Sequence, residues 1–151
     1  NVIYLTGYTK GNLNGVSNSG NSDIFLLKQY DNSTYISTIR LGTSSAEEGR
    51  SVTVDSTSAS ANVYLTGRTE GALTGTNLGD YDAFLTKYNS SGTRQWVKQM
   101  STSSGEHGYG VTYSSNYIYA VGNTGGELDN NTNSGHQDVF LFKYHNNGTK
   151  Q

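Results

Sequence analysis

The sequence contains three copies of one two-part phrase, and this repetition constrains the fold more than any other feature. The first part, Tyr-Leu-Thr-Gly-x-Thr or a close variant, begins at Tyr4, Tyr64 and Tyr119. The second part, Asp-x-Phe-Leu-x-Lys, follows after a loop in each copy. A spacing of about 57 residues means that each repeat is one supersecondary unit, which cannot bury its apolar face alone. The sequence therefore predicts units that pack against one another.

The middle copy is complete and indicates how one unit folds. Short alternating segments predict four strands, at residues 62–67, 81–88, 93–99 and 108–113. The run Asn89-Ser-Ser-Gly92 predicts a tight turn between the second and third strands. No segment has the 3.6-residue period of a helix. Four short antiparallel strands form one blade of a β-propeller, so we expect an all-β fold built of such blades.

The first copy follows the same pattern, and the third is partial. Strands of the first copy are expected at residues 2–6, 23–30, 34–41 and 50–55. No glycine lies between Asp31 and Tyr35, so a different turn is expected there. The expected boundaries are propeller repeat 1 at residues 1–61, repeat 2 at 62–116, and the first two strands of repeat 3 at 117–151. About two and a half repeats do not close a ring of ~4–8 blades, so we expect a longer repeat chain.

Composition narrows the class of protein. Only 15% of the 151 residues are charged, against roughly 25% in ordinary globular chains. The 12 tyrosines and four phenylalanines argue against disorder, and abundant Asn, Ser and Thr is typical of extracellular bacterial β-proteins. A net charge of −2 disfavours a nucleic-acid partner, and no apolar run approaches the ~20 residues of a membrane span. Without cysteine, disulfides and thiolate metal sites are excluded.

Three kinds of residue recur at equivalent positions and are expected to be structural. The glycines are expected where a strand ends or bends and a side chain would clash. The aspartates are expected to accept backbone N–H groups at the start of the second strand, and the phenylalanines to pack between neighbouring blades. One active site needs no threefold duplication, which disfavours a catalytic role. These positions are Gly7, Gly67 and Gly122, Asp23, Asp82 and Asp138, and Phe25, Phe84 and Phe140.

Three segments of the middle copy follow one another in a specific order. They are Asn62-Val-Tyr-Leu-Thr-Gly-Arg-Thr69, Gly79-Asp-Tyr-Asp-Ala-Phe-Leu-Thr-Lys-Tyr-Asn-Ser-Ser-Gly-Thr-Arg-Gln-Trp96 and Gly108-Tyr-Gly-Val-Thr-Tyr113. In this order they resemble the bacterial SBBP repeat, a β-propeller repeat. The likeness covers essentially the whole chain and is looser in the first and third copies. It implies a propeller within a large secreted, surface-anchored or lipoprotein-type chain, and it implies no catalytic residues.

Three segments carry side chains that occur in metal or catalytic sites. Asp129-Asn-Asn-Thr-Asn-Ser-Gly135 has alternating oxygen ligands but lacks the EF-hand glycine and glutamate, which favours a solvated loop and leaves bound calcium open. His136 and Asp138 share one face, yet two ligands are too few for a metal. Glu47-Glu48 and Glu106 are interpreted as exposed turn acids. No catalytic triad or phosphate loop occurs, so we predict no enzyme, cofactor or metal site.

The sequence favours a non-enzymatic propeller module, a structural or protein-interaction scaffold on a bacterial surface or in a secreted protein. Its partners would be other repeats of the same longer chain and protein or glycan ligands. The loops at 9–22, 69–80 and 124–137 differ among copies and are expected on one side of the ring. The alternative is a carbohydrate-binding propeller, in which Tyr8, Trp96 and Tyr109 stack on sugars, although Trp96 also fits a buried strand. A hydrolase formed around the channel of a full ring is a third hypothesis.

Overall fold

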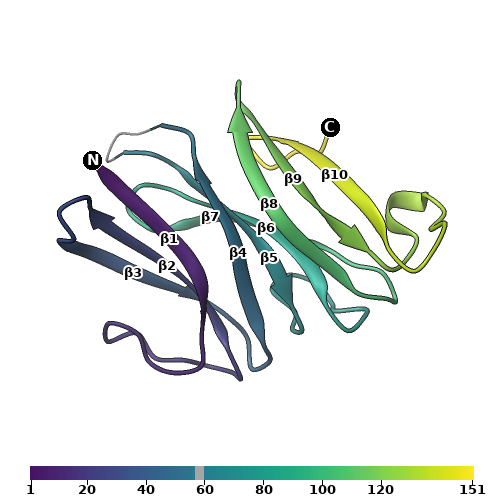
Figure 1. Ribbon diagram of the computed structural model, residues 1–151, viewed down its shortest axis with the longest axis horizontal. Helices are drawn as coiled ribbons and strands as arrows, with labels where there is room; N and C mark the ends of the chain where they lie inside the picture. The colour runs from purple at the N-terminus through teal and green to yellow at the C-terminus, as the bar shows by residue number, and fades with distance from the viewer. Residues whose placement is uncertain (57–59) are drawn as a thin grey trace.

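The computed structural model describes residues 1–56 and 60–151 as three antiparallel β-sheets lying side by side (Figure 1). The first sheet has three strands, the middle sheet four and the third sheet three, which confirms the predicted all-β class. Within the described residues the helical structure is limited to one turn of 3-10 helix, Leu128–Asn130. The strands are β1 (Val2–Thr9), β2 (Asp23–Tyr30), β3 (Tyr35–Leu41), β4 (Glu47–Val54), β5 (Val63–Thr69), β6 (Asp82–Tyr88), β7 (Arg94–Met100), β8 (Glu106–Ser114), β9 (Tyr117–Thr124) and β10 (Asp138–His145).

The strands lie where the alternating pattern predicts them, with differences at their ends. Strands β4 and β8 begin earlier than expected, at Glu47 and Glu106. The Glu47 N–H donates to the Ser22 carbonyl at 2.8 Å, and the Glu106 N–H donates to the Tyr81 carbonyl at 2.7 Å. These hydrogen bonds tie the start of each strand to a neighbouring segment. The two glutamates are therefore strand residues rather than the exposed turn acids that we expected.

The sheets and the sequence repeats are offset by one strand. The expected fourth strand of the first copy, β4, pairs with β5 of the second copy, and β8 likewise pairs with β9. The strand orders are β1-β2-β3, β4-β5-β6-β7 and β10-β9-β8. Each later sheet thus takes its first strand from the preceding sequence copy. The chain passes from one sheet to the next through residues 42–46 and 101–105.

Two hydrophobic cores hold the three sheets together. The first core lies between the first and middle sheets, and its buried members are Ile24, Leu26, Leu41, Val63, Leu65, Phe84 and Tyr88. The second core lies between the middle and third sheets, with Tyr64, Ala83, Leu85, Met100, Ile118, Ala120, Leu128, Phe140, Phe142 and Tyr144. The middle sheet contributes to both cores because successive residues of a strand point to opposite faces. On β6, Phe84 faces the first core and Leu85 the second.

The turn between the second and third strands is the same in the first copy as in the second, contrary to our expectation. Ser33 has a φ of 66° and takes the place of Gly92, whose φ is 84°. The Ser33 N–H donates to the Tyr30 carbonyl at 2.9 Å, and the Gly92 N–H donates to the Asn89 carbonyl at 3.0 Å. The turn geometry is therefore kept by forcing serine into the left-handed region, which non-glycine residues seldom occupy.

The long loops that follow β1, β5 and β9 lie at the same end of their sheets, the lower end in the view of Figure 1. These are the loops whose sequences differ most among the copies. The strands β4 and β8, which open the middle and third sheets, lie next to each other, and β1 lies next to β4 (Figure 1). The fold thus presents one end formed by the variable loops.

Candidate functional site

The recurring glycines and phenylalanines are cross-strand pairs. Gly7 lies opposite Phe25, Gly67 opposite Phe84 and Gly122 opposite Phe140. A Cβ at Gly7 would lie 2.9 Å from the ring of Phe25, and a Cβ at Gly67 would lie 2.9 Å from the ring of Phe84. Each ring therefore lies across the bare backbone of its glycine, which explains why the two residue types recur together. These pairs are structural features of the sheets.

The recurring aspartates lie at the start of the second strand of each copy. Asp23 and Asp82 are fully buried, and Asp138 is partly exposed. Asp23 accepts the Ser19 N–H at 2.6 Å, and Asp138 accepts the Ser134 N–H at 2.8 Å. Burial raises the pKa of the Asp82 carboxyl. These carboxylates hold the preceding loops against the strands.

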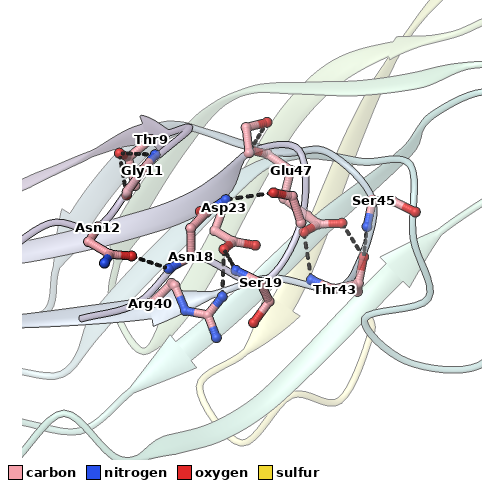
Figure 2. A network of polar contacts seen from close by, with 12 residues as sticks. Thr9, Gly11, Asn12, Asn18, Ser19, Asp23, Arg40, Thr43, Ser45 and Glu47 are labelled. Carbon is pink, nitrogen blue, oxygen red and sulfur yellow. Dashed lines mark hydrogen bonds and ion pairs between the residues drawn. The ribbon is translucent and has the colours of Figure 1, made fainter.

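A side chain of the third strand also reaches two of these aspartates. Arg40 of β3 donates to Asp23 at 2.5 Å, as Figure 2 shows together with the Ser19 contact. Gln99 of β7 donates to Asp82 at 2.6 Å. The equivalent position next to β10 holds no strand among the described residues. The contact is therefore repeated in the first and middle sheets.

Glu47 and Glu106 are fully buried acids with matching partners. Glu47 accepts hydrogen bonds from the Thr43 N–H at 2.7 Å and the Thr43 hydroxyl at 2.6 Å (Figure 2). Glu106 accepts the same pair from Thr102 at 2.7 and 2.6 Å. A threonine hydroxyl of the next strand completes each set, Thr69 at 3.0 Å and Thr124 at 2.9 Å. These carboxylates fasten the link between sheets to the first strand of the next sheet.

One polar and aromatic cluster does not recur among the copies, and its residues come from β4, β5, β8 and the residue just before β6. Its ionic part joins Glu48 to two arginines. Glu48 accepts from Arg68 at 3.0 and 2.7 Å and from Arg50 at 3.1 Å. Glu48 and Arg68 are directly opposite in the β4–β5 pairing, and their side chains are 23% and 20% exposed. The hydrogen bond from Arg68, followed by that from Arg50, holds the pKa of Glu48 below its usual range.

Aromatic side chains cover both arginines of this cluster. The guanidinium of Arg68 lies 4.0 Å from the centroid of the Tyr81 ring, and that of Arg50 lies 5.0 Å from the Tyr109 ring. His107 lies between the two tyrosines, with ring centroids 5.4 Å from Tyr81 and 6.1 Å from Tyr109. We call this set the arginine–tyrosine cluster: Glu48, Arg50, Arg68, Tyr81, His107 and Tyr109.

The surroundings of the histidine in the arginine–tyrosine cluster disfavour its charged form and lower its pKa. Burial lowers the pKa of His107, and the positive charges of Arg68 and Arg50 lower it further. Its Nδ1 atom is buried and has no hydrogen-bond partner among the described residues. Tyr109 is 49% exposed and lies beside the guanidinium of Arg50. A flat ring next to charged donors suits the binding of a polar ligand with an apolar face, such as a sugar.

The aromatics predicted to bind ligands do not lie in one cluster. Tyr8 is 51% exposed near the end of β1, and Tyr109 belongs to the arginine–tyrosine cluster. Trp96 packs against the second core, where its ring lies 6.2 Å from Tyr64 and 6.5 Å from Tyr144. Its indole N–H donates to the Asn146 carbonyl at 3.2 Å. Trp96 is therefore a packing residue of β7, the alternative considered for it from the sequence.

The asparagine-rich loop and the His136 pair give no metal cluster. Within the described residues no three His, Asp or Glu side chains lie close enough together to hold a metal ion. Asp129 contacts Lys150, and Asp138 holds the loop through Ser134. His136 is exposed. In the part of the chain that the structure describes, no helix has the length and apolarity required to cross a membrane.

The arginine–tyrosine cluster was missed by the sequence analysis because its members differ from copy to copy. Arg68 is replaced by Tyr8 and Asn123 at the equivalent positions, directly after the recurring glycine. A search for recurring residues therefore passes over it. The one signal that could have revealed it is that Glu48 and Arg68, of opposite charge, face each other on neighbouring strands. That signal can be recognised only when β4 is known to pair with β5.

Comparison with known proteins adds no family to these observations. No protein-family model matches the sequence, and no curated protein matches it significantly.

Proposed function

We propose that the chain is a β-propeller repeat module of a secreted or surface-exposed bacterial protein, with a structural or protein-interaction role and no catalytic one. The SBBP-like order of motifs supports this proposal, as does the face-to-face packing of three similar sheets. One observation carries it: the outer faces of the end sheets expose apolar side chains at positions that the middle sheet buries.

The outer face of the first sheet supplies half of that observation. Ile3 and Leu5 on β1 are 39% and 42% exposed. Their counterparts on β5, Val63 and Leu65, are 2% and 1% exposed because they pack in the first core. The same sheet position is therefore a packing surface where a neighbouring sheet is present.

The outer face of the third sheet supplies the other half. Val139 and Leu141 on β10 are 85% and 63% exposed. Their counterparts on β6, Ala83 and Leu85, are fully buried in the second core. Large exposed apolar patches on soluble proteins mark interaction surfaces. Further sheets of the same kind, supplied by other repeats of a longer chain, fit both faces.

A series of lengthened chains tests this proposal. Residues 96–151 are appended once, twice and three times after Gln151, since Gln151 occupies the repeat position of Gln95. If sheets stack, the unfolding temperature rises with each added copy, and binding of a dye for apolar surfaces falls when a ring closes. The matched control carries aspartate at the Phe140 position of the added copy, which blocks face-to-face packing. Equal stability of the array and its control would contradict the proposal.

A carbohydrate-binding role is the second candidate, supported by the half-exposed Tyr109 beside Arg50. A glycan array probed with the 151-residue chain tests it. Tyr109→Ala should abolish any binding that this cluster provides. Tyr35→Ala is the matched control, because Tyr35 is also 49% exposed but lies on β3. Binding that survives Tyr109→Ala, or no binding to any glycan, would contradict this role.

A further inference from the structure

Strands β3 and β7 occupy the same repeat position, at one edge of the first sheet and of the middle sheet. Each is the last strand of its sheet within the described residues, and each is followed along the chain by the first strand of the next sheet. Their edge position is therefore set by the internal path of the chain. Both strands also have a register shift near the preceding turn, so the two edges can be compared residue by residue.

The edge of the middle sheet carries the charges that normally protect an exposed edge. Strand β7 has two cations, the exposed Arg94 and the partly buried Lys98. Unpaired N–H and C=O groups at an edge recruit further strands, and charged side chains on the edge oppose this. Two copies of β7 could pair only by bringing four cations into one seam, where like charges repel. This edge is protected against a second copy.

The corresponding positions of β3 carry no charge. Tyr35, which is 49% exposed, and Ile39 take the places of the two cations. The one charged residue of β3, Arg40, donates to the buried carboxylate of Asp23 at 2.5 Å, so its charge is balanced within its own sheet. The strand contains neither proline nor glycine. A short segment of this kind, with high β-propensity and little charge, readily pairs with an identical segment.

The hydrogen bonds between β2 and β3 show which backbone groups of β3 point away from the sheet. The Tyr30 N–H of β2 donates to the Thr34 carbonyl, so the even-numbered residues of β2 face β3. Lys28 is one of these residues, and it lies opposite Ser37. The backbone groups of Ser37 therefore bond within the sheet. Those of the next residue, Thr38, point outward from the edge.

The loop between β1 and β2 contacts β3 without covering these groups. The Asn14 amide donates to the Thr38 hydroxyl at 3.0 Å. This contact uses the side chain, which stands on the face of the sheet, whereas strand pairing uses the backbone. Among the described residues, no loop backbone group bonds to the backbone of Thr38. The outward N–H and C=O groups of this residue can therefore accept another strand.

A second copy of this chain fits the edge across a two-fold axis. Because Thr38 points outward in both copies, the two Thr38 residues can form a hydrogen-bonded pair with Cα atoms about 5.5 Å apart. Ser37 then lies opposite Ile39 and Arg40 opposite Ile36 of the other copy, so no charge faces a like charge. The net charge of −2 gives little repulsion between copies. Two-fold pairs of this kind are the commonest protein assemblies.

We propose that the edge of β3 is the interface of a two-fold dimer, in which β3 of one copy pairs antiparallel with β3 of a second copy around Thr38. The pairing joins the first sheets of the two copies into one continuous sheet. This inference concerns a strand edge, and it rests neither on the stacking of sheet faces nor on the binding of a sugar.

The first experiment measures dimerisation of the 151-residue protein by sedimentation equilibrium. Thr38→Lys and Thr38→Glu each place two like charges opposite each other at the axis, and each weakens dimerisation about fivefold. An equimolar mixture of the two variants regains the association of the unaltered chain, because opposite charges then meet. Val97→Lys, at the equivalent position of β7, is the matched control and leaves dimerisation unchanged.

The second experiment locates the interface. In ¹⁵N spectra of the unaltered chain, exchange of the Thr38 N–H slows as the protein concentration rises, whereas exchange of the Val97 N–H does not. The chain has no cysteine, so single cysteine variants report on one position each. Thr38→Cys forms a disulfide-linked dimer under mild oxidation, because a Cα separation of about 5.5 Å suits a disulfide. Val97→Cys does not form one.

Three results would overturn the proposal. One is a monomer at every concentration up to about 1 mM, since a specific dimer would form below it. Another is association without slower exchange at Thr38, because a different surface, such as an outer sheet face, would then join the copies. The third is a mixture of the two charged variants that associates as weakly as either variant alone. The stacking proposal is tested on lengthened chains, so either proposal can fail alone.

Discussion

The two cores occupy the same repeat positions and are filled differently. At three positions the first core has Thr86, Ser37 and Val54 where the second has Phe142, Trp96 and Tyr113. The second core is therefore richer in aromatic rings, and we call it the aromatic core: Phe140 and Phe142 stack at 5.0 Å, and Tyr64 and Tyr113 stack at 5.7 Å. Sheet spacing and backbone pairing tolerate both fillings. The repeat fixes which face is buried, and the size of the side chains that fill it varies.

Both cores also bury polar atoms: in the first core, burial raises the pKa of Tyr88 to about 12 and the Tyr4 hydroxyl has no hydrogen-bond partner among the described residues. Burial raises the pKa of Tyr64, and it raises the pKa of Tyr144 to about 12. The Tyr64 hydroxyl is buried without a hydrogen-bond partner among the described residues, whereas the indole of Trp96 has the Asn146 carbonyl. Aromatic packing thus fills more volume and carries the cost of desolvated polar groups.

The largest expected effect comes from equivalent deletions in the two cores. Leu65→Ala and Leu85→Ala each remove a leucine that is almost fully buried in the middle sheet, one in each core. Each should lower the free energy of unfolding by about 2–5 kcal/mol. Leu85→Ala should cost more, because rigid rings collapse less readily into a cavity than aliphatic chains do. Denaturant unfolding measures both, and a larger loss for Leu65→Ala would contradict this difference between the cores.

The buried glutamates test whether the two sheet junctions are equivalent despite their different cores. Glu47 and Glu106 each accept three hydrogen bonds through their two carboxylate oxygens. Glutamine at either position replaces one of these oxygens with an NH₂ group, which donates and cannot accept. Each substitution should cost about 1–3 kcal/mol, and the two losses should agree closely. Glu127→Gln, at an exposed position, is the control and should be neutral. Unequal losses of unfolding free energy would mean that the side chains in the adjacent core affect the sheet junction.

Trp96→Phe probes the aromatic core alone. The substitution removes the hydrogen bond to the Asn146 carbonyl and part of the contact with Tyr144, so a loss of about 1–2 kcal/mol is expected. Since Trp96 is the only tryptophan, its emission in the unaltered chain reports the second core. Leu65→Ala should move the emission and circular-dichroism transitions together if the cores unfold cooperatively. Separate transitions would show that each core unfolds by itself.

The smallest effect concerns pH and the arginine–tyrosine cluster, which lies outside both cores. The pKa of His107 in the folded chain lies below its ordinary 6.5, so the unfolded chain binds more protons between the two values. Stability should therefore fall as the pH drops through that window and should be unaffected above it. His107→Gln should remove this part of the dependence. His136→Gln, at an exposed site, should keep it, and a slope unchanged by His107→Gln would contradict the assignment.

Much of the fold follows from the sequence because it combines two periods, the two-residue alternation within each strand and the repeat of about 57 residues. Alternation along Asp82–Tyr88 assigns Phe84 and Leu85 to opposite faces, and the repeat extends the assignment to the other copies. The pairing partner of β4 could not be predicted in this way. The strands before and after β4 in the chain, β3 and β5, both run antiparallel to it, so either could be its partner. A repeat can also be divided at any point along its length, so the period does not show which strand begins a sheet.

The buried acids and the candidate site were hidden for different reasons. Glu47 and Glu106 each lie two residues before a glycine in a polar context, which resembles an exposed turn. The recurrence of Thr43 and Thr102 four residues earlier was the overlooked signal of a hydrogen-bonded set. The arginine–tyrosine cluster depends on which strands are neighbours, so its geometry became visible only with the sheets.

The one-strand offset determines where a single unit can be cut out of this chain. A fragment spanning 62–116 would carry β5, β6 and β7 without β4, and it would end with β8 separated from its own sheet. A fragment from Thr43 to Ser101 would hold all four strands β4–β7, together with the threonine that clasps Glu47. Protein engineers who shuffle or graft such units would therefore place their junctions just before that threonine rather than at the start of the recurring tyrosine phrase.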